Sequence, residues 1–398
     1  MSSGDPISNI SLNEIYDYLA SRENQTLVDL LEEQCKKHGV SQRQLSQIIG
    51  IQRKSLQRIL EGEAQKVDVL TLLKINQFLG LDINEVIKLY VSGIPSESVK
   101  ELEASRKSAF IVKHFDLEGL KKSGFIKSLV DFDEIEQRIL SFFSLESIYE
   151  YESEVSSALF SRTKKSTHDK MMEFWVKSAY LQFQKVNNPN DYNRDSLLEL
   201  ITKIKPYTRQ VGKGLTTVVK ALFNTGVTVI IQSYMTKTQI RGGTFIVNGK
   251  PCIVLTDFNK RYDTLWFTLL HELCHVLFDL DTIETTRYHL SGEPDIFLIE
   301  EEANQFARDY LLKQEKLALV KPFIFSDGVV EEYARQWKIH PSIIYGLYLN
   351  ENEKYYPKFR SYITKSDEAV RTLKLSSWDE KSILEHAEKI KKVLMSNS

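Results

Sequence analysis

An H-E-x-x-H motif, His271, Glu272 and His275, lies inside a long apolar run of the chain. Residues four apart lie on one face of a helix, so the two imidazoles can bind one metal ion. Glu272 follows on the same turn, close enough to activate a water molecule beside that ion. The other residues between Leu265 and Phe278 are apolar, Thr or Cys, which predicts a buried helix. Burying three polar side chains is costly unless a metal pairs them; the alternative is core histidines bonded to the backbone, with the glutamate reaching solvent.

The third ligand must come from elsewhere, because catalytic zinc sites usually have three protein ligands. Three successive glutamates, Glu300, Glu301 and Glu302, precede an apolar stripe on a predicted helix. Glu300 lies near that stripe and one turn before Asn304, whereas Glu301 points to the opposite side. We therefore expect Glu300 to be the ligand, with Glu302 as the alternative and Asn304 as a partner of a ligand. Such glutamates also simply favour a helix N-terminus.

A second pattern, at residues 41–62, fits a helix-turn-helix. Ser41 can cap its first helix, and Gly50 can take the left-handed conformation that the turn needs. The spacing places five apolar residues in the core: Leu45, Ile49, Ile51, Leu56 and Ile59. The expected DNA-contacting residues are Gln42, Gln52, Arg53, Lys54, Ser55, Gln57 and Arg58. The alternative is a helical bundle that only dimerises or docks a protein.

Composition limits the remaining possibilities. With 398 residues, 42% of them hydrophobic and 27% charged, the chain can form two or three globular domains. A net charge of −2 means that any attraction to DNA must be local. Three widely spaced cysteines and a polar N-terminus predict a cytoplasmic protein, and no apolar run is long enough to span a membrane.

The catalytic segment has the pattern of a small α+β fold. Residues 227–231 predict a strand, and residues 244–247 and 252–255 predict a hairpin around Asn248-Gly249. We expect these strands to form a small antiparallel sheet that precedes the metal-binding helix. Asp263 is the expected N-cap of that helix, and residues 280–298 are expected to form a loop.

Both halves resemble known families. Residues 27–91 are similar to phage-repressor-like (Xre-type) helix-turn-helix domains, and residues from about 170 to 312 resemble ImmA/IrrE metallopeptidases. The second resemblance rests on the H-E-x-x-H run, on Arg241-Gly242-Gly243-Thr244 and on the segment Glu300–Ala307.

The ImmA/IrrE resemblance implies that His271, His275 and Glu300 bind a single Zn²⁺ ion and that Glu272 is the catalytic base. Two departures from the family pattern, Cys274 in place of a glycine and Lys313 in place of a proline, remove no catalytic group.

The expected fold is multidomain, with an all-α helix-turn-helix domain followed by a mainly helical α+β zincin-like domain. The predicted parts are an N-terminal extension (1–24), the DNA-binding domain (25–93), a helical support region (94–200), the metallopeptidase core (201–319) and a C-terminal helical region (320–398). Ser92–Ser96 is the expected linker after the DNA-binding domain.

Two functions follow from these expectations. In the first, a zinc-dependent endopeptidase with its own DNA-binding domain regulates transcription by cleaving a repressor- or antitoxin-type partner in a stress, phage-defence or toxin–antitoxin switch. A substrate strand would pair with the sheet edge at the hairpin 244–255, and Tyr288 and His289 are candidates to stabilise the oxyanion. In the second, the chain is a DNA-binding antitoxin and autoregulator whose peptidase fold mainly binds a toxin. Both predict a homodimer on operator DNA and no membrane partner.

Overall fold

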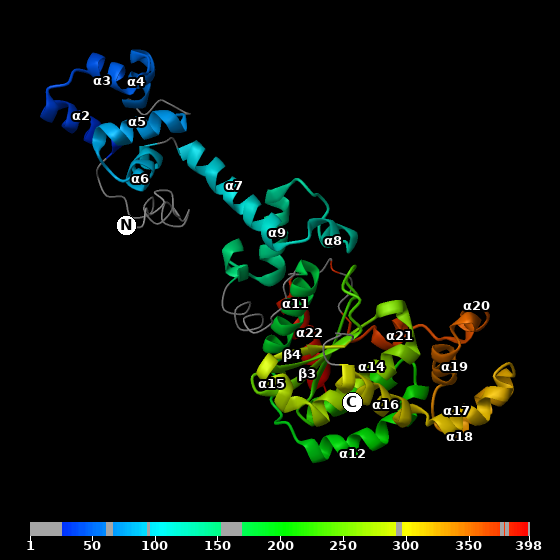
Figure 1. The fold of residues 1–398 in the computed structure, drawn as a ribbon. Coiled ribbons are helices and arrows are strands. Elements are labelled where there is room, and N and C mark those ends of the chain that lie inside the picture. Colours follow the sequence, from blue (N-terminus) through cyan, green and yellow to red (C-terminus); the bar gives the residue numbers. More distant parts are fainter. Residues whose placement is uncertain are drawn as a thin grey trace. The chain divides into compact units, whose positions relative to one another are not determined.

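The computed structural model describes residues 26–60, 67–93, 96–152, 169–291, 297–374, 378 and 382–396. The predicted N-terminal extension and residues 94–95 of the predicted linker lie outside this part of the chain. The chain, drawn in Figure 1, divides into two compact units, Met1–Ala109 and Phe110–Ser398. Each unit has its own hydrophobic core. No helix in the described ranges is long and apolar enough to cross a membrane.

The first unit is helical. Its helices are α2 (Leu27–His38), α3 (Gln42–Ile49), α4 (Arg53–Leu60), α5 (Val69–Leu79) and α6 (Ile83–Gly93), and α7 (Ser96–His114) runs across the boundary between the units. Ser41 caps α3 through a reciprocal pair of hydrogen bonds with Gln44, and Gly50 ends α3 with a φ of 70°.

The helix-turn-helix core forms largely as expected. Leu45, Ile49, Leu56 and Ile59 are buried, and Ile51 packs partly buried against them. Ser92 and Gly93, which we expected in a linker, instead extend α6 by a half-turn beyond the buried Val91.

The second unit surrounds a small sheet with helices (Figure 1). Before the sheet come α8 (Leu117–Lys122), α9 (Phe132–Phe143), η1 (Ile148–Glu152), α11 (Lys170–Val186), α12 (Arg194–Ile204), η2 (Lys205–Arg209) and α13 (Gly214–Asn224). The sheet region contains β1 (Thr228–Gln232), β2 (Gly242–Val247), β3 (Lys250–Thr256), η3 (Phe258–Lys260), α14 (Tyr262–Phe278), α15 (Leu280–Thr286) and β4 (Tyr288–Leu290). After it come α16 (Phe297–Leu311), α17 (Gln314–Val320), η5 (Lys321–Phe323), α18 (Asp327–Gln336), α19 (Pro341–Glu351), η6 (Glu353–Tyr355), α20 (Tyr356–Phe359), η7 (Arg360–Tyr362), α21 (Asp367–Val370) and α22 (Ile383–Met395).

The sheet is mixed, not antiparallel as predicted. Its order is β1-β3-β2-β4, with β1 parallel to β3 and the other two pairings antiparallel. The hairpin of β2 and β3 forms around Asn248-Gly249 as expected. The prediction failed because β1 skips the next strand and joins the far side of the hairpin, where β3 runs in its own direction.

Two local predictions around α14 were also wrong. Asp263 is not the N-cap, because it lies in the first turn and accepts two hydrogen bonds from Arg261, at 2.6 and 3.2 Å. Residues 280–298, expected to be a loop, include α15 and β4, and the backbone of β4 pairs with β2. The pairing between strands distant in sequence overrides the weak local signal of a three-residue strand.

One hydrophobic core serves the whole second unit. Its buried members run from Ile111 to Leu394, so the predicted support, catalytic and C-terminal regions share it. The boundaries that we predicted inside this unit stay predictions. At the centre of this core, α14 packs against β2, β3, α16 and α19, which holds the motif residues rigidly.

Candidate functional site

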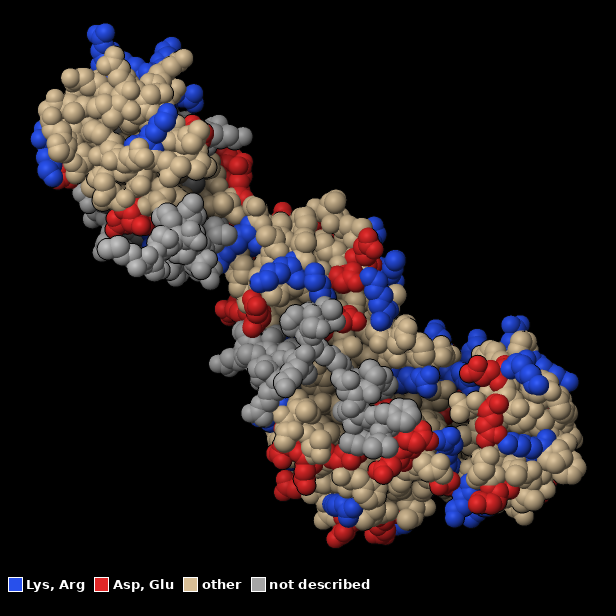
Figure 2. All heavy atoms as spheres, in the orientation of Figure 1, with Lys and Arg blue, Asp and Glu red and all other residues tan. Residues whose placement is uncertain are grey.

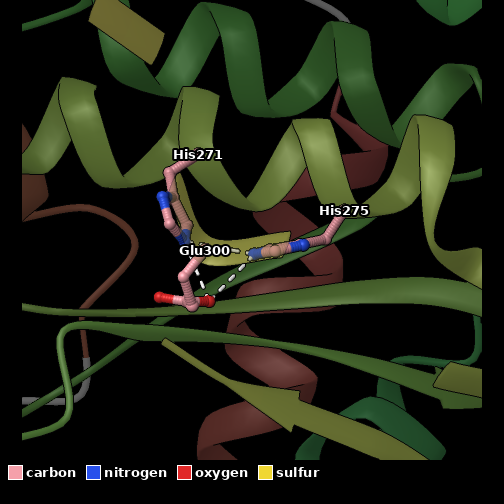
Figure 3. A group of neighbouring side chains, drawn as sticks. All are labelled: His271, His275 and Glu300. Carbon is pink, nitrogen blue, oxygen red and sulfur yellow. Dashed lines mark hydrogen bonds and ion pairs between the residues drawn. The ribbon is translucent and has the colours of Figure 1, made fainter. Parts of the chain in front are cut away.

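His271 and His275 on α14 meet Glu300 on α16 at one point (Figure 3). The two Nε2 atoms are 3.1 Å apart, and Oε1 of Glu300 lies 3.5 Å from Nε2 of His271 and 3.3 Å from Nε2 of His275. Ligands at zinc distances on a tetrahedron are about 3.3–3.4 Å apart. The three donor atoms therefore have the spacing of one face of a tetrahedral zinc site.

Both imidazoles are held with Nε2 facing this point. Nδ1 of His271 lies 3.1 Å from Oδ1 of Asn304, and Nδ1 of His275 lies 2.8 Å from Oδ2 of Asp279. Because these oxygens accept, each Nδ1 carries the proton and each Nε2 keeps its lone pair for a metal. The sequence reasoning missed Asp279, although its position four residues after His275 places it on the same helical face.

The charges around the group favour a cation. Burial alone would lower the pKa of His275, but hydrogen bonds to Asp279 and Glu300 raise that pKa to about 9. Burial opposes ionisation of Glu300, yet its hydrogen bonds with His271, His275 and His289 hold the pKa of this carboxyl well below its usual value. A divalent ion can replace the proton that this group otherwise binds tightly.

The structure separates the two glutamates that the sequence left as alternatives. Glu300 is only 13% exposed and faces the histidines, whereas Glu302 is exposed and Glu301 pairs with Arg308. Burial raises the pKa of the Cys274 thiol to about 12, so it stays protonated and offers no thiolate to a metal at neutral pH.

Both carboxylate oxygens of Glu272 contact hydroxyl groups from the sheet side. Oε2 accepts a hydrogen bond of 2.8 Å from Thr244 on β2, and Oε1 bonds with Ser291, directly after β4. The side chain is fully buried. A Cβ atom added to Gly242 would lie 2.7 Å from Oε1 of Glu272, so only glycine lets β2 approach α14 this closely. The sheet thus fixes where the carboxylate points.

Of the two residues considered for the oxyanion, only His289 faces the group. Its Nε2 lies 2.7 Å from Oε1 of Glu300, and its ring centre is 4.4 Å from that of His275. Tyr288 points to the other face of β4 and stacks on Phe245.

The expected docking place for a substrate strand was wrong. The strands of the hairpin 244–255, β2 and β3, are both interior, because each pairs with two neighbours. Among the described strands, β4 is an edge strand of the sheet and carries His289, which contacts Glu300.

In the first unit, the predicted DNA-contacting residues lie on or next to α3 and α4. Gln42 lies on α3 and Gln52 immediately precedes α4. The residues expected on α4 are Arg53, Lys54, Ser55, Gln57 and Arg58. All seven are exposed, and Lys and Arg side chains project around the end of the unit that carries α3 and α4 (Figure 2).

Comparison with known proteins assigns part of this chain. Searches of curated proteins and of solved structures find no match. Residues 31–91, from α2 to α6, match the family model of the Cro/C1-type HTH DNA-binding domain. The first unit therefore contains a DNA-binding domain of the Cro/C1 helix-turn-helix type.

Proposed function

We propose that this chain is a DNA-binding transcription regulator with a zinc-dependent endopeptidase centre, which cleaves a repressor- or antitoxin-type protein partner. The observation that carries the proposal is the group of His271, His275 and Glu300, whose donor atoms have a spacing suited to zinc. Glu272 directly follows His271 in sequence, and a hydrogen bond from Thr244 holds its carboxylate. The stress, phage-defence or toxin–antitoxin setting is an expectation from the ImmA/IrrE resemblance.

The residues divide the chemistry among them. A zinc ion, when held by the three ligands, supplies Lewis acidity that lowers the pKa of water to about 7. Glu272 takes a proton from the attacking water, whose oxygen bonds to the peptide carbonyl carbon. The same carboxyl then donates that proton to the amine nitrogen as the C–N bond breaks. Thr244 and Ser291 hold Glu272 in place, and His289 is the candidate to hold the carbonyl oxygen.

The first test is the metal content of the purified full chain by elemental mass spectrometry. We expect about one zinc per chain, and loss of that zinc in His271→Ala. His38→Ala is the matched control, because His38 is exposed on α2 in the other unit. Retention of zinc in His271→Ala would place the metal elsewhere and remove the basis of the proposal.

The second test looks for cleavage. The wild-type chain and Glu272→Gln, which keeps shape and loses the base, are incubated with protein extract from cells that carry the gene, and new N-termini are mapped by mass spectrometry. We expect new termini only with the wild type, while Glu272→Gln retains its zinc. Identical sets of termini from both chains would contradict the mechanism.

The DNA-binding role is tested by selecting bound fragments from genomic DNA and measuring affinity against salt. Arg53→Ala combined with Lys54→Ala should weaken binding. It should also reduce the slope of log affinity against log salt concentration by about two. Lys100→Ala, exposed on α7 outside the matched domain, should have no effect. Operator binding that persists in Glu272→Gln, with zinc bound but no partner ever cleaved, would favour the rival function of an antitoxin that binds a toxin without cutting it.

A further inference from the structure

An open pocket of about 930 Å³ lies in the second unit, and none of His271, His275 and Glu300 lines it. Its walls include the turn between β3 and α14 and the segment from η7 to Lys365, which are about one hundred positions apart in sequence. Backbone hydrogen bonds join the two walls: Tyr262 N–H donates to the Thr364 carbonyl, and Ser366 N–H donates to the Lys260 carbonyl. The pocket is therefore a product of the tertiary fold, and its size suits a small-molecule ligand.

The pocket carries an excess of positive charge. Among the described residues, its lining contains one carboxylate, Asp257, and five basic residues, namely Lys260, Arg261, Arg360, Lys365 and Lys374. Two of the cations are neutralised, because Lys374 pairs with Asp257 at 2.6 Å and Arg261 with Asp263 at 2.6 Å. Lys260 lies 3.9 Å from Asp367, and both side chains are mostly exposed.

Arg360 and Lys365 are different, because no described residue forms an ion pair with either of them. Both are exposed at the pocket, and Lys and Arg side chains gather around α20 and α21 (Figure 2). Two cations that have no ion-pair partner among the described residues, in the lining of one concave site, attract anions, and a guanidinium and an ammonium together suit the oxygens of a phosphate.

Aromatic rings complete the lining. Tyr356 is 42% exposed, with the Arg261 guanidinium 5.6 Å from its ring centre. Tyr234 packs against Phe258, and its carbonyl accepts a hydrogen bond from the indole of the buried Trp378. A flat ring system can stack on the exposed ring of Tyr356.

We propose that this pocket binds a small phosphorylated ligand of nucleotide size. Its phosphates would contact Arg360 and Lys365, with Lys260 nearby, and its ring system would lie against Tyr356. A nucleic acid fits less well, because the cations surround a concave pocket and do not form a stripe that could follow a sugar–phosphate backbone.

The wall of this pocket is continuous in the backbone with the helix that carries the proposed metal ligands His271 and His275. Arg261 immediately precedes α14, which carries His271 and His275, and its side chain pairs with Asp263 in the first turn of that helix. A ligand that contacts Arg261 would therefore contact the residue that immediately precedes this helix.

The test is isothermal titration calorimetry of the full chain with ADP, inorganic pyrophosphate and adenosine as probes. We expect saturable binding of ADP and pyrophosphate, no measurable binding of adenosine, and ADP affinity about fivefold or more above that of pyrophosphate because of the ring contact. Arg360→Ala combined with Lys365→Ala should weaken ADP binding at least tenfold, consistent with the loss of two charge-assisted contacts.

Lys358→Ala is the matched control, because Lys358 is exposed two residues from Arg360 and contacts Phe325 outside the pocket. It should leave ADP affinity unchanged. If the double variant does not fold, the salt dependence of ADP binding to the wild type replaces it, and affinity should fall as NaCl rises. The proposal would be overturned if none of the three probes bound at 5 mM, or if adenosine bound as tightly as ADP. It would also be overturned if ADP affinity were unchanged in the folded double variant or did not depend on salt. Equal affinities for ADP and pyrophosphate would overturn the role of the ring.

Discussion

At the scale of single residues, the proposed metal site depends on two side chains that are not among its three ligands. Asp279 and Asn304 accept from the Nδ1 atoms of the two histidines and so orient each Nε2 toward Glu300. Such partners fix the tautomer of a ligand and increase its basicity. Their removal should weaken metal binding without removing any ligand.

Asp279→Ala should lower zinc affinity about 10- to 100-fold, because His275 loses the acceptor of its Nδ1 proton. The measurement is a zinc titration in competition with a chelator. Asp281→Ala removes the same charge from an exposed position on α15 and should leave the affinity unchanged. Equal affinities in the two variants would show that Asp279 does not orient the ligand.

The metal-free chain should lose stability as the pH rises from about 6.5 to 9. Although burial lowers it, Asp279 and Glu300 raise the pKa of His275 to about 9 from 6.5, so the folded chain binds this proton more tightly than the unfolded chain. The resulting stabilisation is complete below pH 6.5 and disappears as the pH rises through 9.

Urea unfolding of the chelator-treated chain at several pH values measures this decline. The decline should be absent with zinc bound and smaller in Asp279→Ala, where the hydrogen bond that raises the pKa is missing. A stability of the metal-free second unit that increases between pH 6.5 and 9 would contradict this assignment.

At the scale of elements, the close approach of β2 to α14 holds the carboxylate of Glu272, the proposed catalytic base, in place. Gly242 lies against Glu272 and Thr268, and a Cβ atom there would come within 2.7 Å of each of them. Thr244, two residues further along β2, donates to the same carboxylate.

Gly242→Ala should destabilise the second unit by about 1–3 kcal/mol, because the added methyl group overpacks the contact between strand and helix. If cleavage is established, it should also fall, since Glu272 must move. Gly328→Ala is the control: an added Cβ there meets no atom within 4 Å, and alanine favours the helix α18. The measurement is the free energy of unfolding of each variant. Equal values for the two variants would mean that β2 can shift away from α14 without a loss of stability.

At the scale of the whole molecule, the chain has two separate hydrophobic cores. One lies in the DNA-binding unit and includes Ile75, and the other extends from Ile111 to Leu394 in the unit that contains His271, His275 and Glu300. Metal binding should therefore stabilise one unit and leave the other unchanged.

Calorimetry of the full chain should show two transitions, of which only one rises when zinc is added. At a free zinc concentration 100 times Kd, the gain is about 2.7 kcal/mol. Ile75→Val should lower the other transition and so identify the DNA-binding unit. A zinc-dependent shift of both transitions, or one that survives in His271→Ala, would contradict the assignment of the metal to the second unit alone.

Local spacing explains which predictions succeeded. The helical repeat brings His271 beside His275, Ser41 reaches the first turn of α3, and Asn248-Gly249 closes a hairpin between its neighbours. Each of these arrangements depends on the backbone geometry of a few consecutive residues, so it can be read from the sequence.

The sequence by itself determined the helix-turn-helix and the two histidines and one glutamate of the motif helix. Only the tertiary structure decided that Glu300 and not Glu302 faces those histidines, that Ser291 and Thr244 hold Glu272, and that β1 joins β3 to make the sheet mixed. The pocket between residues 257–261 and 356–374 is likewise a feature that only the tertiary structure decided. These contacts join segments far apart in the chain, and their energies depend on how whole elements pack, which no local pattern of residue types specifies.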